Sequence, residues 1–205
     1  MATSAADLKE RLRFYDADSR VMLHEVPWKD YERLLEIRGD SAGVRMAYLE
    51  GELELMTPSR SHETIKKKIA RLLEAWAEEA GIDLEGIGSW TLRKAPRRCG
   101  AEPDECYIVG GRQSRIPDIV IEVMWTPGGL DKLELYRGLS IPEVWLWREG
   151  NIEVHVLAKP GYVRKTKSRI LPGLDLKRLC SFLDQGSQSQ AVRAFRRCLQ
   201  KARRA

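Results

Sequence analysis

Apolar and polar residues follow helical spacing in some segments of the chain and extended spacing in others. The segment SHETIKKKIARLLEAWAEEAG (61–81) repeats its apolar residues every three or four positions, with a serine before it, and it ends at Gly81. This predicts the clearest helix. Further helices are predicted at WKDYERLLEIRG (28–39), GLDKLELYRGL (129–139), DLKRLCSFL (175–183) and the basic C-terminal segment.

Extended runs bounded by turn residues predict the strands. RMAYLEGELELMTPS (45–59) predicts a hairpin around Glu50-Gly51, and EVWLWREGNIEVHVL (143–157) predicts another that turns at residues 149–151. The remaining strands are predicted within residues 88–95, 103–110, 115–125 and 161–166.

The order of these elements predicts one α/β domain with a restriction-endonuclease-like core. A helix leads into a mixed sheet with a central antiparallel meander, and a crossover helix follows the meander. We expect one nuclease-like domain over residues 1–205, with a core at about 21–180 and a basic helical tail at about 186–205.

Composition narrows the class of protein. The 205 residues are 43% apolar and 32% charged, and no apolar run approaches the roughly 20 residues of a membrane helix. The N-terminal residues lack an apolar signal core, so we expect a cytoplasmic protein that does not bind membranes. The four cysteines are scattered and complete no zinc-site spacing, which indicates reduced thiols.

The net charge of +5 is a mild basic bias whose placement matters more than its size. TLRKAPRRCG (91–100) and the C-terminal tail are the two basic clusters. Both could contact phosphates, or both could be solvated surface. The candidate nucleic-acid-binding residues are Arg93, Lys94, Arg97 and Arg98.

The strand IPDIVIEVMW (116–125) is apolar yet carries Asp118 and Glu122. A buried carboxylate is costly unless a metal, a cation or hydrogen bonds compensate it. The two acids lie roughly 13 Å apart along one strand, too far to share one ion. If the preceding hairpin turns near residue 113, Asp104 faces Glu122 instead, with a Cα separation of about 5 Å. Asp118 is then a structural acid.

Lys132 follows the strand that carries Glu122 and opens the next predicted helix. A helix that leaves the strand end can direct a lysine back toward the acids, and Tyr136 lies one turn further on the same face. Alternatively, Lys132 is a solvent-facing neighbour of Glu134.

The ordered set PDECY, PDIVIEV and DKLELYRGLSIPEVWLW, with LEGELELMTPSRSHETI upstream, resembles the Uma2 family of restriction-endonuclease-like proteins, a branch of the PD-(D/E)XK nuclease superfamily. The resemblance spans roughly residues 21–157. It implies that Asp104 and Glu122 bind a metal, that Lys132 replaces the lysine missing at Met124, and that Glu52 is an additional acid. His62 matches the histidine that opens the family's helix, although a histidine there commonly bonds nearby backbone.

The resemblance implies a Mg²⁺- or Mn²⁺-dependent endodeoxyribonuclease that acts on DNA, and a homodimer is plausible. The ion would be held by Asp104, Glu122 and the carbonyl of Val123, with Lys132 orienting water, Glu52 nearby, and His62 and Tyr136 as accessory groups. The alternative is a nucleic-acid-binding or scaffold protein that keeps the fold without cleavage, since Met124 carries neither charge nor proton.

Overall fold

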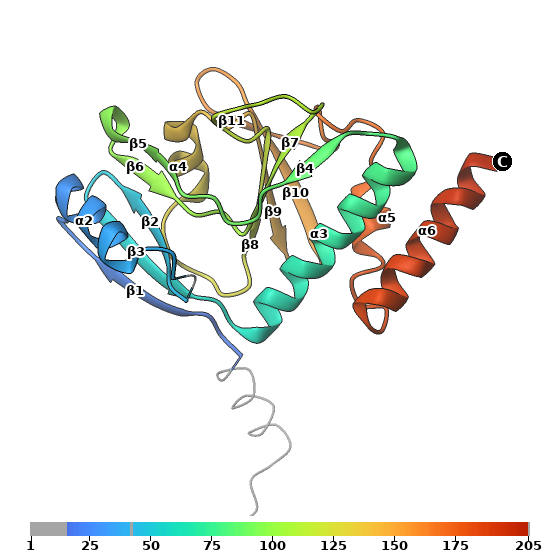
Figure 1. The fold of residues 1–205 in the computed structure, drawn as a ribbon, viewed down its shortest axis with the longest axis horizontal. Coiled ribbons are helices and arrows are strands. Elements are labelled where there is room, and N and C mark those ends of the chain that lie inside the picture. Colours follow the sequence, from blue (N-terminus) through green and yellow to red (C-terminus); the bar gives the residue numbers. More distant parts are fainter. Residues whose placement is uncertain (1–15, 42, 205) are drawn as a thin grey trace, which may run out of the picture.

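The computed structural model describes residues 16–41 and 43–204, which form two β-sheets and the helices around them (Figure 1). The five-stranded sheet has the order β1-β3-β2-β6-β5 and the six-stranded sheet has the order β11-β10-β9-β8-β7-β4. All pairs are antiparallel except β8 with β9. The fold is therefore mixed α/β, as predicted, but with two sheets in place of one.

The five-stranded sheet comprises β1 (Ser19–Leu23), β2 (Arg45–Leu49), β3 (Glu52–Thr57), β5 (Leu92–Lys94) and β6 (Cys99–Ala101). The six-stranded sheet comprises β4 (Leu84–Gly86), β7 (Glu105–Val109), β8 (Ile119–Val123), β9 (Glu143–Arg148), β10 (Asn151–Leu157) and β11 (Tyr162–Lys165). The predicted meander is wrong in one respect, because β5 pairs with β6 rather than with β7. The short helix η1 (Ala95–Arg97) turns the chain between β5 and β6 and so sends both strands to the other sheet.

The helices are α2 (Trp28–Arg38), α3 (Arg60–Ala80), α4 (Lys132–Leu139), α5 (Leu176–Cys180) and α6 (Gln188–Arg204). The start and stop signals predicted for α3 hold in the structure. The Ser59 side chain accepts a hydrogen bond from the His62 backbone at the start of α3, and Gly81 ends that helix in the left-handed conformation. Asp131 caps α4 through the backbone N–H groups of Leu133 and Glu134.

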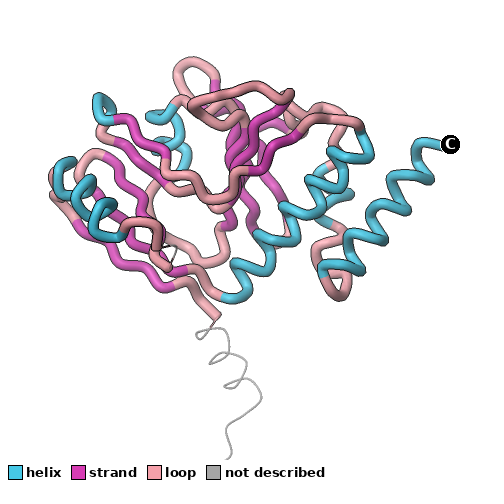
Figure 2. Tube along the Cα trace, viewed as in Figure 1, coloured by secondary structure: helices cyan, strands magenta, loops and turns pink. Residues whose placement is uncertain are grey.

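The six-stranded sheet is covered on both faces (Figures 1 and 2), and its strand β8 is buried along its whole length. The odd-numbered residues of β8 pack with α3, α5 and α6, whereas Val120 packs with α4 and with residues of the five-stranded sheet. The even face of β8, which includes Glu122, therefore looks into the space between the two sheets. Helix α2 closes the outer face of the five-stranded sheet through Tyr31 and Leu35.

The basic C-terminal segment is a helix, as predicted, and it packs along α3. Arg196 pairs with Glu78 and Glu79, and Arg203 bonds the Glu79 carbonyl, so part of its charge is already balanced. In the described part of the chain, no helix combines the length and the apolar character needed to cross a bilayer. All four cysteines are free, and burial raises the pKa of the Cys106 thiol to about 12.

Candidate active site

The β7–β8 hairpin brings Asp104 next to Glu122. Its ladder pairs Glu105 with Ile121 and Cys106 with Val120, which is the register predicted from a turn near residue 113. Asp104 directly precedes this ladder, and its Oδ2 accepts a hydrogen bond of 2.6 Å from the Val123 backbone N–H. The predicted register, which places Asp104 opposite Glu122, is therefore confirmed.

A third carboxylate, that of Glu54, reaches the same region from β3 of the other sheet. Glu54, Asp104 and Glu122 expose only 1%, 1% and 3% of their surface. Lys132 lies between two of them, with Nζ at 3.5 Å from Glu54 Oε1 and 3.7 Å from Glu122 Oε1. We call these four residues the acidic centre. Its position between the sheets explains the burial, because both sheets contribute acids to one interior.

Helix α4 delivers Lys132 because it begins at that residue directly after the loop that follows β8. The lysine side chain is 9% exposed, so it is directed inward and not toward solvent. One turn later, the Tyr136 hydroxyl donates to Glu122 Oε1. Complete burial and the neighbouring Glu122 carboxylate raise the Tyr136 pKa well above its usual value, so the phenol stays a hydrogen-bond donor. The predicted shared face of these two residues is confirmed.

Asp104 is held by groups that sequence analysis did not connect with it. Arg45, at the start of β2, forms an ion pair with Asp104 Oδ1, and His62 Nε2 lies 2.9 Å from the same oxygen. The other ring nitrogen of His62 faces Asp18 Oδ2 at 3.1 Å, so each ring nitrogen faces a carboxylate oxygen. The interpretation of His62 as a residue that bonds nearby backbone is wrong, since its ring connects two buried carboxylates.

Asp18 completes this chain of contacts from the segment before β1. Burial pushes its pKa upward, but hydrogen bonds from His62 and from the Ser59 backbone outweigh that effect, and the net pKa is lowered. Asp18 is therefore an ionised partner of His62 at neutral pH. The sequence does not indicate this contact, because Asp18 lies 44 positions before His62, and only the fold brings the two residues together.

Glu52, the acid that the motif resemblance selected, does not reach the acidic centre. Its side chain is 43% exposed and its Oε2 lies 2.5 Å from Nδ1 of His24. Glu54 occupies the central position instead, held by Arg20 Nε at 3.3 Å and by the Leu130 backbone N–H at 2.9 Å. Both glutamates lie on the same face of β3, so strand alternation alone does not separate them.

Gly129 permits the close approach of the loop before α4 to Glu54. Its φ is +92°, and a Cβ added there would meet Glu54 Oε2 and, at 3.0 Å, Arg20 Nε. Only glycine combines this backbone conformation with the absence of a side chain. The loop therefore packs directly against the acidic centre, and the Leu130 backbone N–H can donate a hydrogen bond to the Glu54 carboxylate.

Asp118, the competing acid of the apolar strand, has a structural role, as expected. It accepts a hydrogen bond of 2.9 Å from the Val109 backbone N–H and pairs with Arg112 across the hairpin turn. These contacts stabilise the β7–β8 hairpin at the end opposite to Glu122.

The basic cluster chosen as a nucleic-acid contact lies away from the acidic centre. Lys94 donates to Ser140 Oγ and Arg98 donates to Tyr48, whereas Arg93 and Arg97 are exposed. Ser140 follows the last residue of α4, and Lys132 is its first. At 1.5 Å per residue, the two ends of this helix lie about 10 Å apart. The cluster therefore faces the opposite end of α4 from Lys132.

The donor set of Asp104 and Glu122 fits a small divalent cation. Asp104 Oδ2 accepts one hydrogen bond, from the Val123 backbone N–H, and its Oδ1 faces Arg45 and His62, against the roughly four lone-pair sites of a carboxylate. Within residues 16–41 and 43–204, the bonds and ion pairs of Glu122 all involve Oε1, which leaves Oε2 for a cation. In the same ranges no three His, Cys, Asp or Glu side chains form a metal-binding group. Carboxylate and carbonyl oxygens with waters suit Mg²⁺ or Mn²⁺.

Comparison with known families agrees with this arrangement. The model of the Uma2 family, whose description is "Putative restriction endonuclease", matches residues 28–192, well over half of the chain. No curated protein matches the sequence. The matched range contains all four residues of the acidic centre together with Arg45 and His62. By sequence, then, the chain belongs to the Uma2 family.

Proposed function

We propose that the protein is a metal-dependent endonuclease that hydrolyses phosphodiester bonds of DNA at the acidic centre. The observation that carries the proposal is the position of Lys132, whose amine lies within 3.7 Å of acids from both sheets. Family membership supports the reaction class. The lysine comes from α4, since the residue two positions after Glu122 is Met124.

Asp104 and Glu122, together with the Val123 carbonyl, would hold the cation, most simply Mg²⁺. A divalent cation at this position supplies Lewis acidity toward a phosphate oxygen and acidifies water. Lys132 would orient the attacking water or stabilise charge that develops on the phosphate. Tyr136 and Glu54 keep Glu122 and Lys132 in place, and His62 and Arg45 do the same for Asp104.

Glu54 replaces Glu52 in this proposal, and the pair provides a matched test. Supercoiled plasmid is incubated with Mg²⁺ or Mn²⁺ and nicking is measured for the wild type, Glu122→Gln, Glu54→Gln and Glu52→Gln. We expect Glu122→Gln to slow nicking by about 100-fold or more and Glu54→Gln by about tenfold or more. Glu52→Gln should stay within about twofold, because its side chain lies at the surface with His24.

Equal nicking by the wild type and Glu122→Gln would contradict the proposal, since the activity would then come from another site or a contaminant. Lys132→Arg, which keeps the buried positive charge beside Glu54 and Glu122, serves as a second variant in case Glu122→Gln folds poorly. Equal losses in Glu52→Gln and Glu54→Gln would refute the assignment of Glu54.

A second function is favoured by one observation, the pairing of each acid of the acidic centre with a basic side chain. Asp104 already faces Arg45 and His62, and Glu54 and Glu122 share Lys132. A nucleic-acid-binding protein could keep such a balanced interior without cleaving. DNA binding without nicking by the wild type, in either metal, would support this alternative.

A further inference from the structure

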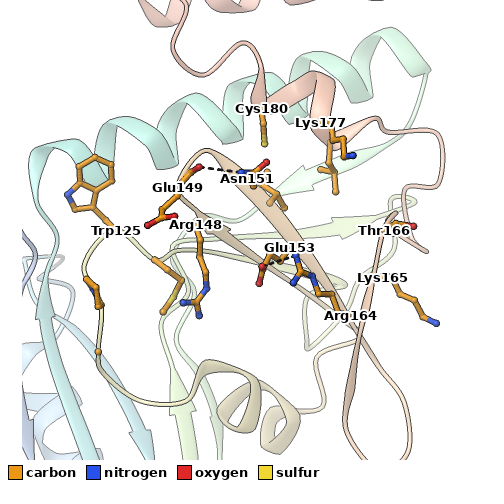
Figure 3. A pocket seen from close by; sticks show the side chains of 15 residues that line it. Trp125, Arg148, Glu149, Asn151, Glu153, Arg164, Lys165, Thr166, Lys177 and Cys180 are labelled. Atoms are coloured by element: carbon orange, nitrogen blue, oxygen red, sulfur yellow. Dashed lines mark hydrogen bonds and ion pairs between the residues drawn. The ribbon is translucent and has the colours of Figure 1, made fainter.

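A groove with a volume of about 910 Å³ opens where the parallel strands β8 and β9 end. Its walls are formed by the residues after β8, the β9–β10 turn, β11 and α5, as Figure 3 shows. In sheets with parallel strands, ligands bind outside the carboxyl ends of those strands, where loops diverge. The groove therefore lies where this architecture leaves room for a ligand.

Four basic residues from three elements line the groove, namely Arg148, Arg164, Lys165 and Lys177, and we call it the basic groove; in Figure 3 the Lys165 side chain points away from the other three. Two acidic residues, Glu149 and Glu153, also line it. Arg164 is balanced by Glu153 Oε1 at 2.9 Å. In the described part of the chain, Arg148, Lys165 and Lys177 form no ion pair, so three cations remain free for a ligand.

The basic groove adjoins the acidic centre through a single loop. Met124 lines the groove and lies two residues after Glu122, a separation of about 7 Å along the strand. The same loop reaches the centre from its other side, because Arg20 bonds the Pro127 carbonyl at 3.1 Å and pairs with Glu54. A polyanion in the groove would thus lie against the loop that leads from Glu122 to Lys132, since Met124, Pro127 and Gly128 line the groove.

The basic surface also extends beyond the groove. A neighbouring hollow shares Lys165 and Thr166 and adds Lys167 and Arg169 to its lining. Among residues 16–41 and 43–204, Lys165, Lys167 and Arg169 form no ion pair, and exposed cations of this kind suit the negative charge of a nucleic-acid backbone. The Arg93–Arg98 cluster lacks this position, since it lies at the other end of α4.

We infer that the basic groove binds the sugar-phosphate backbone of duplex DNA and leads it to the acidic centre. The inference rests on the proposed endonuclease function, for which it names the surface that holds the substrate. Phosphate contacts of this kind position the duplex and carry no sequence information themselves.

The test measures binding without cleavage. A fluorescein-labelled DNA duplex of about 30 base pairs, a length of about three helical turns, is titrated with full-length protein in EDTA, and anisotropy is read at several salt concentrations. The groove variant is Arg148→Glu/Lys177→Glu. The matched control is Arg93→Glu/Arg97→Glu, which makes the same charge change on exposed residues of the other cluster.

We expect the groove variant to weaken the Kd by about tenfold or more and to lower the slope of log Kd against log salt by roughly 1 per lost phosphate contact. The control should change the Kd by less than about twofold. Equal or greater weakening in the control, an unchanged groove variant, or a wild type that binds no duplex would each overturn the inference. Circular dichroism confirms that both variants fold.

Because no metal is present, this experiment is independent of catalysis. A wild type that binds through the groove but does not nick plasmid would refute the endonuclease proposal and leave the binding surface in place. Nicking that depends on Glu122 but not on the groove residues would refute the binding surface and leave the endonuclease proposal in place.

Discussion

In the acidic centre, Lys132 contacts Glu54 and Glu122, and Arg45 contacts Asp104, all away from solvent. In the basic groove, Arg148 and Lys177 are exposed and, in the described part of the chain, lack acidic partners. The comparison shows that lysine and arginine side chains have different roles when they are buried and when they are exposed. Inside, a cation compensates buried carboxylates, and its removal affects folding. Outside, a cation is free to attract an anionic ligand.

The largest expected contrast is in stability and compares Lys132→Met with Lys177→Met. Loss of the buried amine leaves Glu54 and Glu122 without their shared cation, which should lower the free energy of unfolding by about 3 kcal/mol or more. Lys177 is exposed, so its replacement should cost less than about 0.5 kcal/mol. Urea unfolding at neutral pH measures both values. Similar costs would show that Lys132 does not balance the buried acids.

A second comparison uses two glycines, one from each region. Gly129 and Gly150 have φ values of +92° and +83°, so alanine strains the backbone at either position by about 1–2 kcal/mol. Only at Gly129 would the new Cβ also meet Glu54, whereas Gly150, in the turn bordering the groove, has open space. Gly129→Ala should therefore cost about 1–3 kcal/mol more. Equal shifts in urea midpoint would contradict the close packing of the loop on the acidic centre.

The smallest expected effect concerns pH and Asp18, which supports Asp104 through His62. Because its folded pKa lies below that of the unfolded chain, the ionised carboxylate stabilises the fold at neutral pH. This contribution is lost as the pH falls through the folded pKa. Asp18→Asn should thus cost about 1 kcal/mol at pH 7 and progressively less below pH 4. A cost that does not depend on pH would contradict the stabilising role of the ionised Asp18 carboxylate.

Local patterns predicted much of the fold. The helical spacing and Gly81 located α3, and the turn near residue 113 gave the correct register of Asp104 with Glu122. The separation of the strands into two sheets was not predictable in this way. Strand β6 has only three residues, Cys99–Ala101, and is too short to show the alternation of apolar and polar residues that predicts a strand. Its pairing with β5 and β2 is decided by tertiary packing.

Those residues of the acidic centre that lie close together in the sequence could be predicted. Residues that distant elements bring to it could not. Glu122, Lys132 and Tyr136 lie within one strand–helix unit, and all three are at the site. The motif resemblance selected Glu52, whereas the structure places Glu54 beside Lys132, and both occupy one face of β3. What distinguishes them is contact with Arg20 and with the loop at Gly129, which no local pattern contains. Arg45 and Asp18 were missed for the same reason.

The place of Arg164 and Lys165 on β11 has a consequence for the physical behaviour of the protein. Strand β11 forms one edge of the six-stranded sheet, and its free backbone groups could pair with a strand of another molecule. Positive charges along such an edge repel an identical edge on a second copy. Variants made neutral here to abolish DNA affinity would therefore also lose protection against aggregation, and light scattering of concentrated samples should accompany any such experiment.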